Sequence, residues 1–291
     1  MTYTNPPVPH DVNVSSGGFM LDFIKNFLML IGIIIIFIVV IFLGTRYLAK
    51  YIPFRYEKEL AKSILTKNIL TGDQLVKQDY LENLSTKLVQ TMALPDDMNI
   101  EMHLLSLPDF RKLTSNENDN GLNAFTMIGG NIYISEVLLC VLNSENGLSM
   151  IIAHEIAHVK HRDVISHLGA NVISRLTLAL ILGSDITLLG NQMSVDLMSG
   201  QFSQRQEHAA DLFALNSLKQ HYGHTFGADD FFKQISSDQE SDKIVSTWFS
   251  SHPNTKDRID KIESYTQKNY PKNKTNPVLV AIPDFVKKNC K

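Results

Sequence analysis

The amino-acid sequence predicts an α+β protein that is mainly helical, contains a small antiparallel sheet and is preceded by one transmembrane helix. This prediction rests on an uncharged apolar run near the N-terminus, several later segments with apolar residues at helical spacing, and two short apolar segments around a Gly-Gly pair. We expect four parts, namely a flexible tail over 1–26, the transmembrane helix over 27–48, one folded domain over 49–270 and a basic tail over 271–291.

The apolar run Phe27–Gly44 contains 18 residues and no charge. At about 1.5 Å per residue it spans about 27 Å, which is close to the thickness of the hydrocarbon core of a bilayer. A soluble helix would need a polar stripe, and this run has none. A cleaved signal peptide fits less well, because 26 residues precede the run and no small-x-small cleavage site follows it. A retained membrane anchor is therefore expected.

The charged residues around this run bear on its orientation. Lys25 precedes the run closely, whereas a group of basic residues follows it: Arg46, Lys50, Arg55, Lys58 and Lys62. By the positive-inside rule, this asymmetry favours a cytoplasmic location for the folded domain. Large domains override the rule, so the opposite membrane face stays open.

The composition argues against some classes of protein. The chain has 27 basic and 30 acidic residues and a net charge of −3, so we expect no nucleic-acid partner. Its two cysteines, Cys140 and Cys290, are too few for a disulfide framework. Cys140 lies in the apolar run Val137–Leu142 and is interpreted as a small buried side chain. The basic C-terminal tail is interpreted as a solvated end.

The elements of the folded domain follow from the spacing of its apolar residues. The pattern predicts helices over 56–70, 78–92, 144–162, 203–218 and 257–270, and strands over 99–105, 122–128 and 131–135. Ser144 is a suitable N-cap for the long central helix. The segment Val164–Gly190 is apolar but interrupted by charged residues, so we expect a packed or membrane-skimming helical hairpin there rather than a second span.

The central helix contains the residues that indicate chemistry. Its sequence AHEIAHVKHRD places His154, Glu155 and His158 in the order H-E-x-x-H. Residues four apart lie on one face of a helix, so the two imidazoles converge on a single metal ion. Glu155 lies beside the first of them and is suited to act as a general base on a water molecule. Two buried histidines and a glutamate would be costly to desolvate without a metal, which favours a metal site.

A catalytic zinc ion takes a third protein ligand and keeps one position open. Glu207 in the later helix is the candidate, and Asp211 lies four residues farther along the same face, where it can bond a ligand imidazole. His208 points about 100° away from Glu207 around the helix and is the weaker alternative. Cys140, as a thiolate ligand, is a further alternative.

Several stretches together resemble one enzyme family: Asn123-Ala124-Phe125, Gly129–Tyr133, His154–His158, Ser203–Asp211, Ser251-His252-Pro253 and Arg258-Ile259. In this order they are similar to the gluzincin zinc metallopeptidases, which include the HtpX-like heat-shock proteases and the CAAX prenyl endopeptidases. The resemblance implies a zincin-type metallopeptidase domain with one Zn²⁺ per chain and Glu207 as the third ligand. The chain departs from the family at Ser203-Gln204-Arg205, where the basic residue is shifted, and it shows no evident membrane helices after the zinc helix. It is therefore most similar to the single-span, soluble-domain branch of quality-control proteases.

These observations predict a membrane-anchored zinc endopeptidase in protein quality control. It would hydrolyse peptide bonds with metal-activated water, with Glu155 as the general base. The expected partners are protein or peptide substrates, including membrane or misfolded proteins, and the lipid bilayer. A non-catalytic zinc-containing chaperone or adaptor is the alternative, although a structural zinc site would not need a base.

The remaining candidates concern substrate binding and one further catalytic residue. The run Gly130–Ser135 is expected to be an edge strand that pairs with an extended substrate. The substrate-binding candidates are Asn123, Ala124, Phe125, Gly130, Asn131 and Ile132. His252 is either a structural histidine at the Pro253 turn or a catalytic residue over the metal, where it stabilises the oxyanion or fills the open position. Arg258 is interpreted as a structural ion-pair partner.

Overall fold

The computed structural model describes residues 4, 18–48, 51–64, 70, 72–114, 116–167, 169, 202–237, 252, 255–270 and 277–290. The chain divides into two units, Met1–Gly44 and Thr45–Lys291. The elements of the second unit are α2 (Phe54–Ile64), α3 (Asp73–Met92), β1 (Glu101–Leu105), α4 (Leu107–Thr114), β2 (Ala124–Met127), η2 (Ile128–Gly130), β3 (Asn131–Ser135), α5 (Glu136–Val141), α6 (Glu145–His161), α9 (Gln204–Tyr222), α10 (Asp230–Ser237), α12 (Thr255–Asn269) and α13 (Asp284–Lys287).

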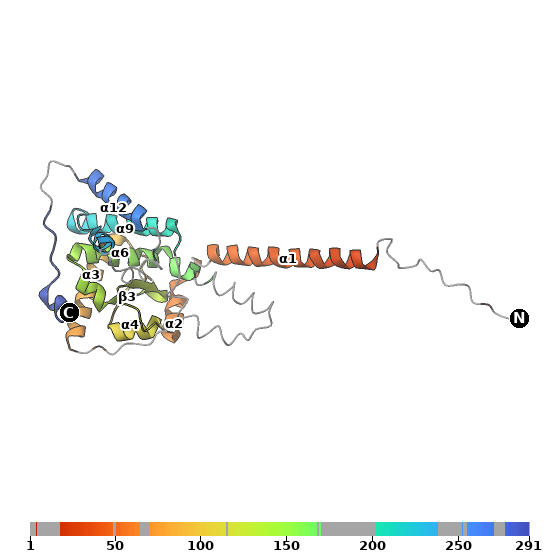
Figure 1. Cartoon of the computed structure of the whole chain (residues 1–291), viewed down its shortest axis with the longest axis horizontal. Coiled ribbons are helices and arrows are strands. Elements are labelled where there is room, and N and C mark those ends of the chain that lie inside the picture. The colour runs from red at the N-terminus through yellow and green to blue at the C-terminus, as the bar shows by residue number, and fades with distance from the viewer. Residues whose placement is uncertain are drawn as a thin grey trace. The chain divides into compact units, whose positions relative to one another are not determined.

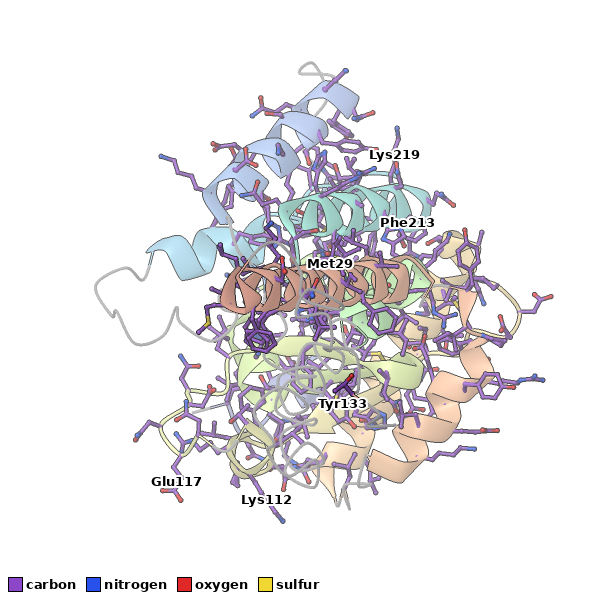
Figure 2. The ribbon with its side chains drawn as sticks, turned by 90° about the vertical axis from the view of Figure 1, so that its right-hand side faces the viewer. Met29, Lys112, Glu117, Tyr133, Phe213 and Lys219 are labelled. Atoms are coloured by element: carbon purple, nitrogen blue, oxygen red, sulfur yellow. A yellow bond between two sulfur atoms is a disulfide. The ribbon has the colours of Figure 1, made fainter. Side chains whose placement is uncertain are left out.

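Most of the first unit's described part is a long apolar helix, α1 (Phe19–Leu48), which begins earlier than the expected start at residue 27 and ends beyond Gly44. Among the described residues, it is the one helix long and apolar enough to cross a membrane, over Phe19–Val40. Its large apolar side chains are exposed, as for Met29, which is labelled in Figure 2. By length and composition, this helix resembles a membrane span.

The second unit contains a small mixed sheet with the strand order β1-β3-β2. β2 and β3 form the antiparallel hairpin that the sequence predicts, with Phe125 opposite Tyr133. β1 instead runs parallel to β3, with Met102 opposite Ile132, so the sheet is not wholly antiparallel as expected. β3 is therefore the central strand, and the prediction that Gly130–Ser135 forms an edge strand is wrong. The hairpin signal reveals only neighbouring strands, whereas β1 pairs across the α4 connection.

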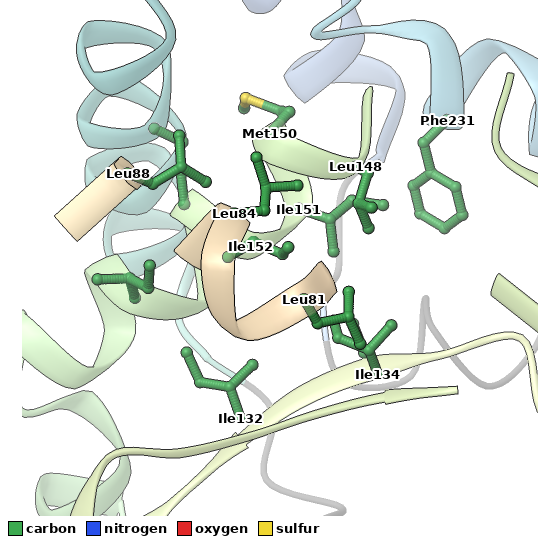
Figure 3. Packing of buried hydrophobic residues seen from close by; sticks show 14 of the residues in the cluster. Leu81, Leu84, Leu88, Ile132, Ile134, Leu148, Met150, Ile151, Ile152 and Phe231 are labelled. Atoms are coloured by element: carbon green, nitrogen blue, oxygen red, sulfur yellow. The ribbon is translucent and has the colours of Figure 1, made fainter. Parts of the chain in front are cut away.

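Alternation of side chains along these strands gives the sheet two apolar faces. On one face, Ile132 and Ile134 of β3 pack in the main core with side chains of α3 and α6 (Figure 3). On the other face, Tyr133 packs in a second core with Phe110 of α4 and Ala61 of α2. In Figure 1, α6 and α9 accordingly lie on one side of β3, and α2 and α4 lie on the other.

The central helix α6 is confirmed where the sequence predicts it. Its N-cap is Ser144, whose hydroxyl accepts a hydrogen bond from Gly147 N at 3.1 Å. The helix ends at Arg162, which adopts a left-handed conformation with φ 61°. Helix α9 packs alongside α6 and begins with a capping box between Ser203 and Gln206. These two capped helices carry most of the candidate site.

Both the backbone conformation and the packing around the hairpin require glycine at positions 129 and 130. Both glycines have positive φ, 75° for Gly129 and 82° for Gly130. A Cβ atom on Gly129 would lie 2.9 Å from the Cβ of Ala61 in α2. A Cβ atom on Gly130 would lie 2.1 Å from the backbone oxygen of Asn99. Only glycine lets α2 and the chain before β1 approach the hairpin this closely.

The C-terminal segment 277–290 packs against the folded unit, so its interpretation as a solvated end is wrong. Val286 is fully buried in the main core. The backbone of Val280 accepts a hydrogen bond from Glu145 N, at the start of α6, at 2.8 Å. The interpretation of Cys140 as a small buried side chain is also wrong, because Cys140 forms a disulfide with Cys290 across 150 residues of sequence. A bond over such a separation leaves no local pattern in the sequence.

The expected helical hairpin over Val164–Gly190 lies largely outside the described residues, which stop at 169 and resume at 202. The described beginning of this segment, through residue 167, is helical.

The disulfide and the packed C-terminal segment predict a loss of stability on reduction. Since the closed loop is long, we expect the Cys290→Ser variant, or wild type in reductant, to lose about 2–5 kcal/mol of unfolding free energy. Thermal unfolding with and without reductant measures this change. The Cys290→Ser variant is the control, since reductant should leave its midpoint unchanged. Equal midpoints for oxidised wild type and this variant would contradict the prediction.

Candidate metal centre

Three separate segments bring their polar side chains to one buried point. Helix α6 contributes His154, Glu155 and His158, helix α9 contributes Glu207, and His252 comes from the chain before α12. One ligand atom each from the three histidines and Glu207 lies within 4.8 Å of all the others. All four side chains are at most 3 % exposed. Helical spacing brings the two α6 histidines together, and the packing of α9 on α6 brings Glu207 to them.

The distances within this cluster fit a tetrahedral metal ion. With metal–ligand bonds of about 2.0–2.1 Å, neighbouring ligand atoms of a tetrahedral zinc site lie about 3.3 Å apart. The Nε2 atoms of His154 and His158 lie 3.0 Å apart. Glu207 lies 3.4 Å from His154 Nε2 and 3.5 Å from His158 Nε2. Two imidazoles and one carboxylate form a donor set typical of catalytic zinc. The residues present therefore fit a bound zinc ion.

His252 adds a further donor to the same point. Its Nδ1 lies 3.0 Å from Glu207 Oε1 and 3.4 Å from His154 Nε2. Its Nε2 lies 3.5 Å from Glu155 Oε1. One ring nitrogen of His252 thus lies among the ligand atoms, and the other faces the carboxylate beside them.

Glu155 is fully buried and held from one side. Its Oε2 accepts a hydrogen bond of 2.7 Å from the hydroxyl of Thr126 in β2, and that hydroxyl also lies 3.0 Å from the Glu155 backbone oxygen. Within the part of the chain that the structure describes, Oε1 of Glu155 accepts no hydrogen bond. A buried carboxylate oxygen is costly without a partner. This geometry leaves Oε1 available to a water molecule or a substrate proton.

The ligand candidates from α6 and α9 are supported by a buried ion pair. Asp211 Oδ1 lies 3.0 Å from Nδ1 of His154. Arg258 donates to both oxygens of Asp211 at 2.7 and 2.8 Å, and its second terminal nitrogen lies 2.7 Å from Glu207 Oε2. Burial favours the neutral form of Asp211, but the charge of Arg258 outweighs it and lowers the pKa of Asp211 to about 2. Asp211 therefore stays ionised and fixes the orientation of His154.

Glu207 is also held in its charged form. Its burial raises the pKa, but contacts with the imidazoles of His252, His154 and His158 outweigh this effect. The pKa of Glu207 consequently lies well below its usual range. A carboxylate that remains ionised in a buried site is suited to bind a cation.

Asp163 supports the second histidine and was not predicted from the sequence. Asp163 Oδ2 lies 2.8 Å from Nδ1 of His158, and its other oxygen accepts a hydrogen bond from Gln206 Nε2 at 2.8 Å. Burial lowers the pKa of His158, but the bonds to Asp163 and Glu207 outweigh it and raise the pKa to about 10. Asp163 lies beyond the end of α6, so helical periodicity does not align it with His158. The nearest signal is its position directly after the helix C-cap, Arg162.

Two further contacts of the site were not predicted from the sequence. The ring of Phe202 stacks on His158 with centroids 3.9 Å apart. The hydroxyl of Thr126, in edge strand β2, donates a hydrogen bond to Glu155. Both contacts depend on tertiary packing, and neither residue stands at a diagnostic spacing from the H-E-x-x-H sequence.

The substrate-binding candidates lie in two groups. Asn123, Ala124 and Phe125 lie at or beside edge strand β2, next to Thr126. The others have structural contacts: Gly130 packs against Asn99, Asn131 bonds Ile128 O and His103, and Ile132 is fully buried in the main core.

The alternative ligands lie apart from the cluster. His208 is exposed, and Cys140 is in the disulfide.

Comparison with known proteins agrees with this site. The family model described as Peptidase family M48 matches residues 100–266, which include every ligand candidate. The mitochondrial metalloendopeptidase OMA1 of Schizosaccharomyces pombe is 26% identical over 223 residues, covering 72% of this chain and 61% of that protein. The chain thus spans less than two thirds of this relative's length. The family match confirms the resemblance read from the motifs: the chain belongs to peptidase family M48.

Proposed function

We propose that this protein is a membrane-anchored zinc endopeptidase in which His154, His158 and Glu207 bind the metal and Glu155 is the general base. The observation that carries the proposal is the position of Oε1 of buried Glu155, which accepts no hydrogen bond from the described residues, beside three converging ligand side chains. A structural zinc site is closed by its ligands and needs no such base. This contrast favours an enzyme over a zinc-containing chaperone or adaptor.

The chemistry divides among the residues of the site. A bound zinc ion would supply Lewis acidity, which polarises the scissile carbonyl and favours ionisation of a water molecule. Glu155 accepts the water proton at Oε1 and returns it to the leaving amine, while Thr126 holds the other oxygen. Asp211 and Asp163 fix the ring orientations of His154 and His158 through their Nδ1 atoms.

The substrate is proposed to bind along β2 rather than β3. Ser135 N donates to Asn123 O at 3.2 Å, so by antiparallel alternation Ala124 and Thr126 direct their main-chain groups away from β3, to the outer edge of the described sheet. The other edge is covered, because the side-chain amide of Gln78 bonds both Met102 O and Leu104 N of β1.

Further features of β2 support this assignment. Its edge adjoins Glu155 through Thr126, and Asn123 has a buried Oδ1 without a hydrogen bond among the described residues. An added substrate strand would be recognised mainly through its backbone, which suits misfolded or membrane proteins of varied sequence. We therefore propose such proteins as substrates and quality control as the role.

His252 is proposed to hold the site closed. Its Nδ1 lies at ligand distance from the other donors, where a fourth ligand would exclude the catalytic water. Movement of His252 would open this position. The residue would then also be able to contact the substrate oxyanion.

The location is proposed from α1 and the disulfide. We propose that α1 is a single membrane span and that the peptidase domain faces an oxidising compartment. The flanking charges favour the cytoplasmic side, but a large domain overrides them. The Cys140–Cys290 bond needs an oxidising environment in most organisms, and it lies in the domain itself.

The Glu155→Gln variant tests the general base. We expect it to bind one zinc ion per chain like wild type and to lose casein cleavage by at least about 100-fold, because only the proton acceptor is removed. Metal analysis and release of acid-soluble peptides measure the two effects. A chelator should abolish wild-type cleavage, and added zinc should restore it. Full cleavage by pure variant would exclude Glu155 as the base. Zinc binding without cleavage in either protein would leave a closed enzyme or an adaptor, which the His252→Ala variant distinguishes.

The Asp163→Asn variant tests the support of His158. Because loss of such a partner typically weakens metal binding, we expect zinc affinity to fall by about 10- to 100-fold. Competition with a chromogenic chelator measures the affinity. Asp257→Asn is the matched control, since that aspartate is 64% exposed on α12 and should not affect the metal. Equal zinc affinities in both variants would show that Asp163 does not support metal binding.

The His252→Ala variant tests the closed position. We expect faster casein cleavage than wild type at equal zinc content, because the fourth position becomes open to water. A fall in the maximal rate with zinc retained would instead assign His252 to the oxyanion. Initial rates with zinc analysis of the same samples distinguish the two outcomes.

A further inference from the structure

Helix α2 is the first element of the folded unit after the apolar helix, since α1 ends at Leu48 and α2 begins at Phe54. Its inner face is formed by Phe54, Glu57 and Ala61, which are 1, 4 and 4% exposed. Phe54 and Ala61 pack as apolar residues do. Glu57 is different, because burying a carboxylate is costly unless its oxygens find charged or hydrogen-bonding partners.

The two oxygens of Glu57 have two different partners. Oε1 lies 2.5 Å from a guanidinium nitrogen of Arg162, and Oε2 accepts a hydrogen bond from Gly129 N at 3.3 Å. Arg162 also donates to the backbone oxygen of Ile52 at 2.6 Å and lies over the ring of Phe54. Burial raises the pKa of Glu57, and the charge of Arg162 opposes this shift. The segment from Ile52 to Glu57 is thus fixed to the end of α6 and to the hairpin turn.

Each of these partners adjoins a residue that supports the candidate active site. Arg162 is the C-cap of α6 and directly precedes Asp163, which holds His158. Gly129 lies in the turn that follows β2, and β2 carries Thr126, which holds Glu155. The carboxylate of Glu57 therefore contacts the neighbours of two supporting residues. These are Asp163, which holds His158, and Thr126, which holds Glu155.

We propose that Glu57 is a positioning residue and that docking of α2 completes the active site. This inference rests on the proposed roles of His158 and Glu155. Helix α2, which follows the proposed membrane anchor in sequence, would hold two turns in fixed positions: the one before Asp163 and the one after Thr126. A change in how α2 docks would then alter catalysis without any contact between α2 and the substrate. Ordinary structural packing is the competing explanation, and it predicts an effect on stability alone.

The test uses the full chain in detergent micelles with Glu57→Gln, which keeps the shape of the side chain and removes its charge. The matched control is Glu59→Gln, on the exposed side of the same helix. Zinc affinity is measured by chelator competition, and kcat and KM are measured with a casein-derived peptide. Glu57 does not contact His158 itself but acts through Arg162 and the adjacent Asp163. We therefore expect zinc affinity to fall by about 3- to 10-fold, less than for loss of Asp163. We also expect kcat to fall by about 10-fold, with KM within about 2-fold of wild type, and Glu59→Gln to match wild type.

Because Glu57→Gln leaves Arg162 buried without its charge partner, a second variant guards against simple unfolding. In Glu57→Gln/Arg162→Gln both charges are absent, and circular dichroism with thermal unfolding reports whether the chain is folded. A folded variant with weaker zinc binding and lower kcat supports the proposal. Wild-type zinc affinity and kcat in a folded variant, or loss of the fold in both variants, would overturn it.

Failure of the proposed function gives a different result. If wild type and the His252→Ala variant both bind zinc but cleave nothing, the endopeptidase assignment is at fault, and the zinc affinities still decide the role of Glu57.

Discussion

The burial of two carboxylates, Glu155 and Glu207, at the contact between α6 and α9 is the constraint on which the rest of the structure depends. An ionised carboxylate in a protein interior costs several kcal/mol unless charges and donors compensate it. Here the compensation comes from three histidines, Thr126 and Arg258, which belong to different segments. Each segment must therefore be capped, packed and held at a fixed position before the two carboxylates can be buried.

The supports around the site follow from this constraint. The Ser144 and Ser203 caps fix where α6 and α9 begin, and the left-handed Arg162 fixes where α6 ends. One face of the sheet contributes twice, since Ile132 and Ile134 pack in the main core with α6 and Thr126 of edge strand β2 bonds Glu155. Without a metal, three imidazoles and two carboxylates would remain close together with little exposure to solvent. A cation resolves this charge arrangement, which is why binding the metal and folding the site are energetically linked.

The sequence predicts the parts of this site that follow from helical geometry. His154 and His158 are four residues apart, as are Glu207 and Asp211, and each pair was expected on one helix face. The hairpin around Gly129-Gly130 and the Ser144 cap were likewise readable from local chemistry. Asp163 and Thr126 were not, because the end of a helix and the packing of a strand decide their direction. The parallel pairing of β1, the disulfide and the burial of Glu57 depend on contacts between distant segments, for which one sequence carries no periodic signal.

The Cys140–Cys290 bond closes a covalent ring around 150 residues of sequence, and every residue of the proposed catalytic centre except Thr126 lies inside it. An endopeptidase is exposed to its own activity and to that of its neighbours. A chain cut once within such a ring does not separate into two molecules, because both pieces stay joined through sulfur. His154 and Glu207 would then remain tethered on one molecule after a cut between them, and the metal would still draw its ligands from a single covalent unit. The linkage thus makes the integrity of the catalytic centre less dependent on an unbroken backbone.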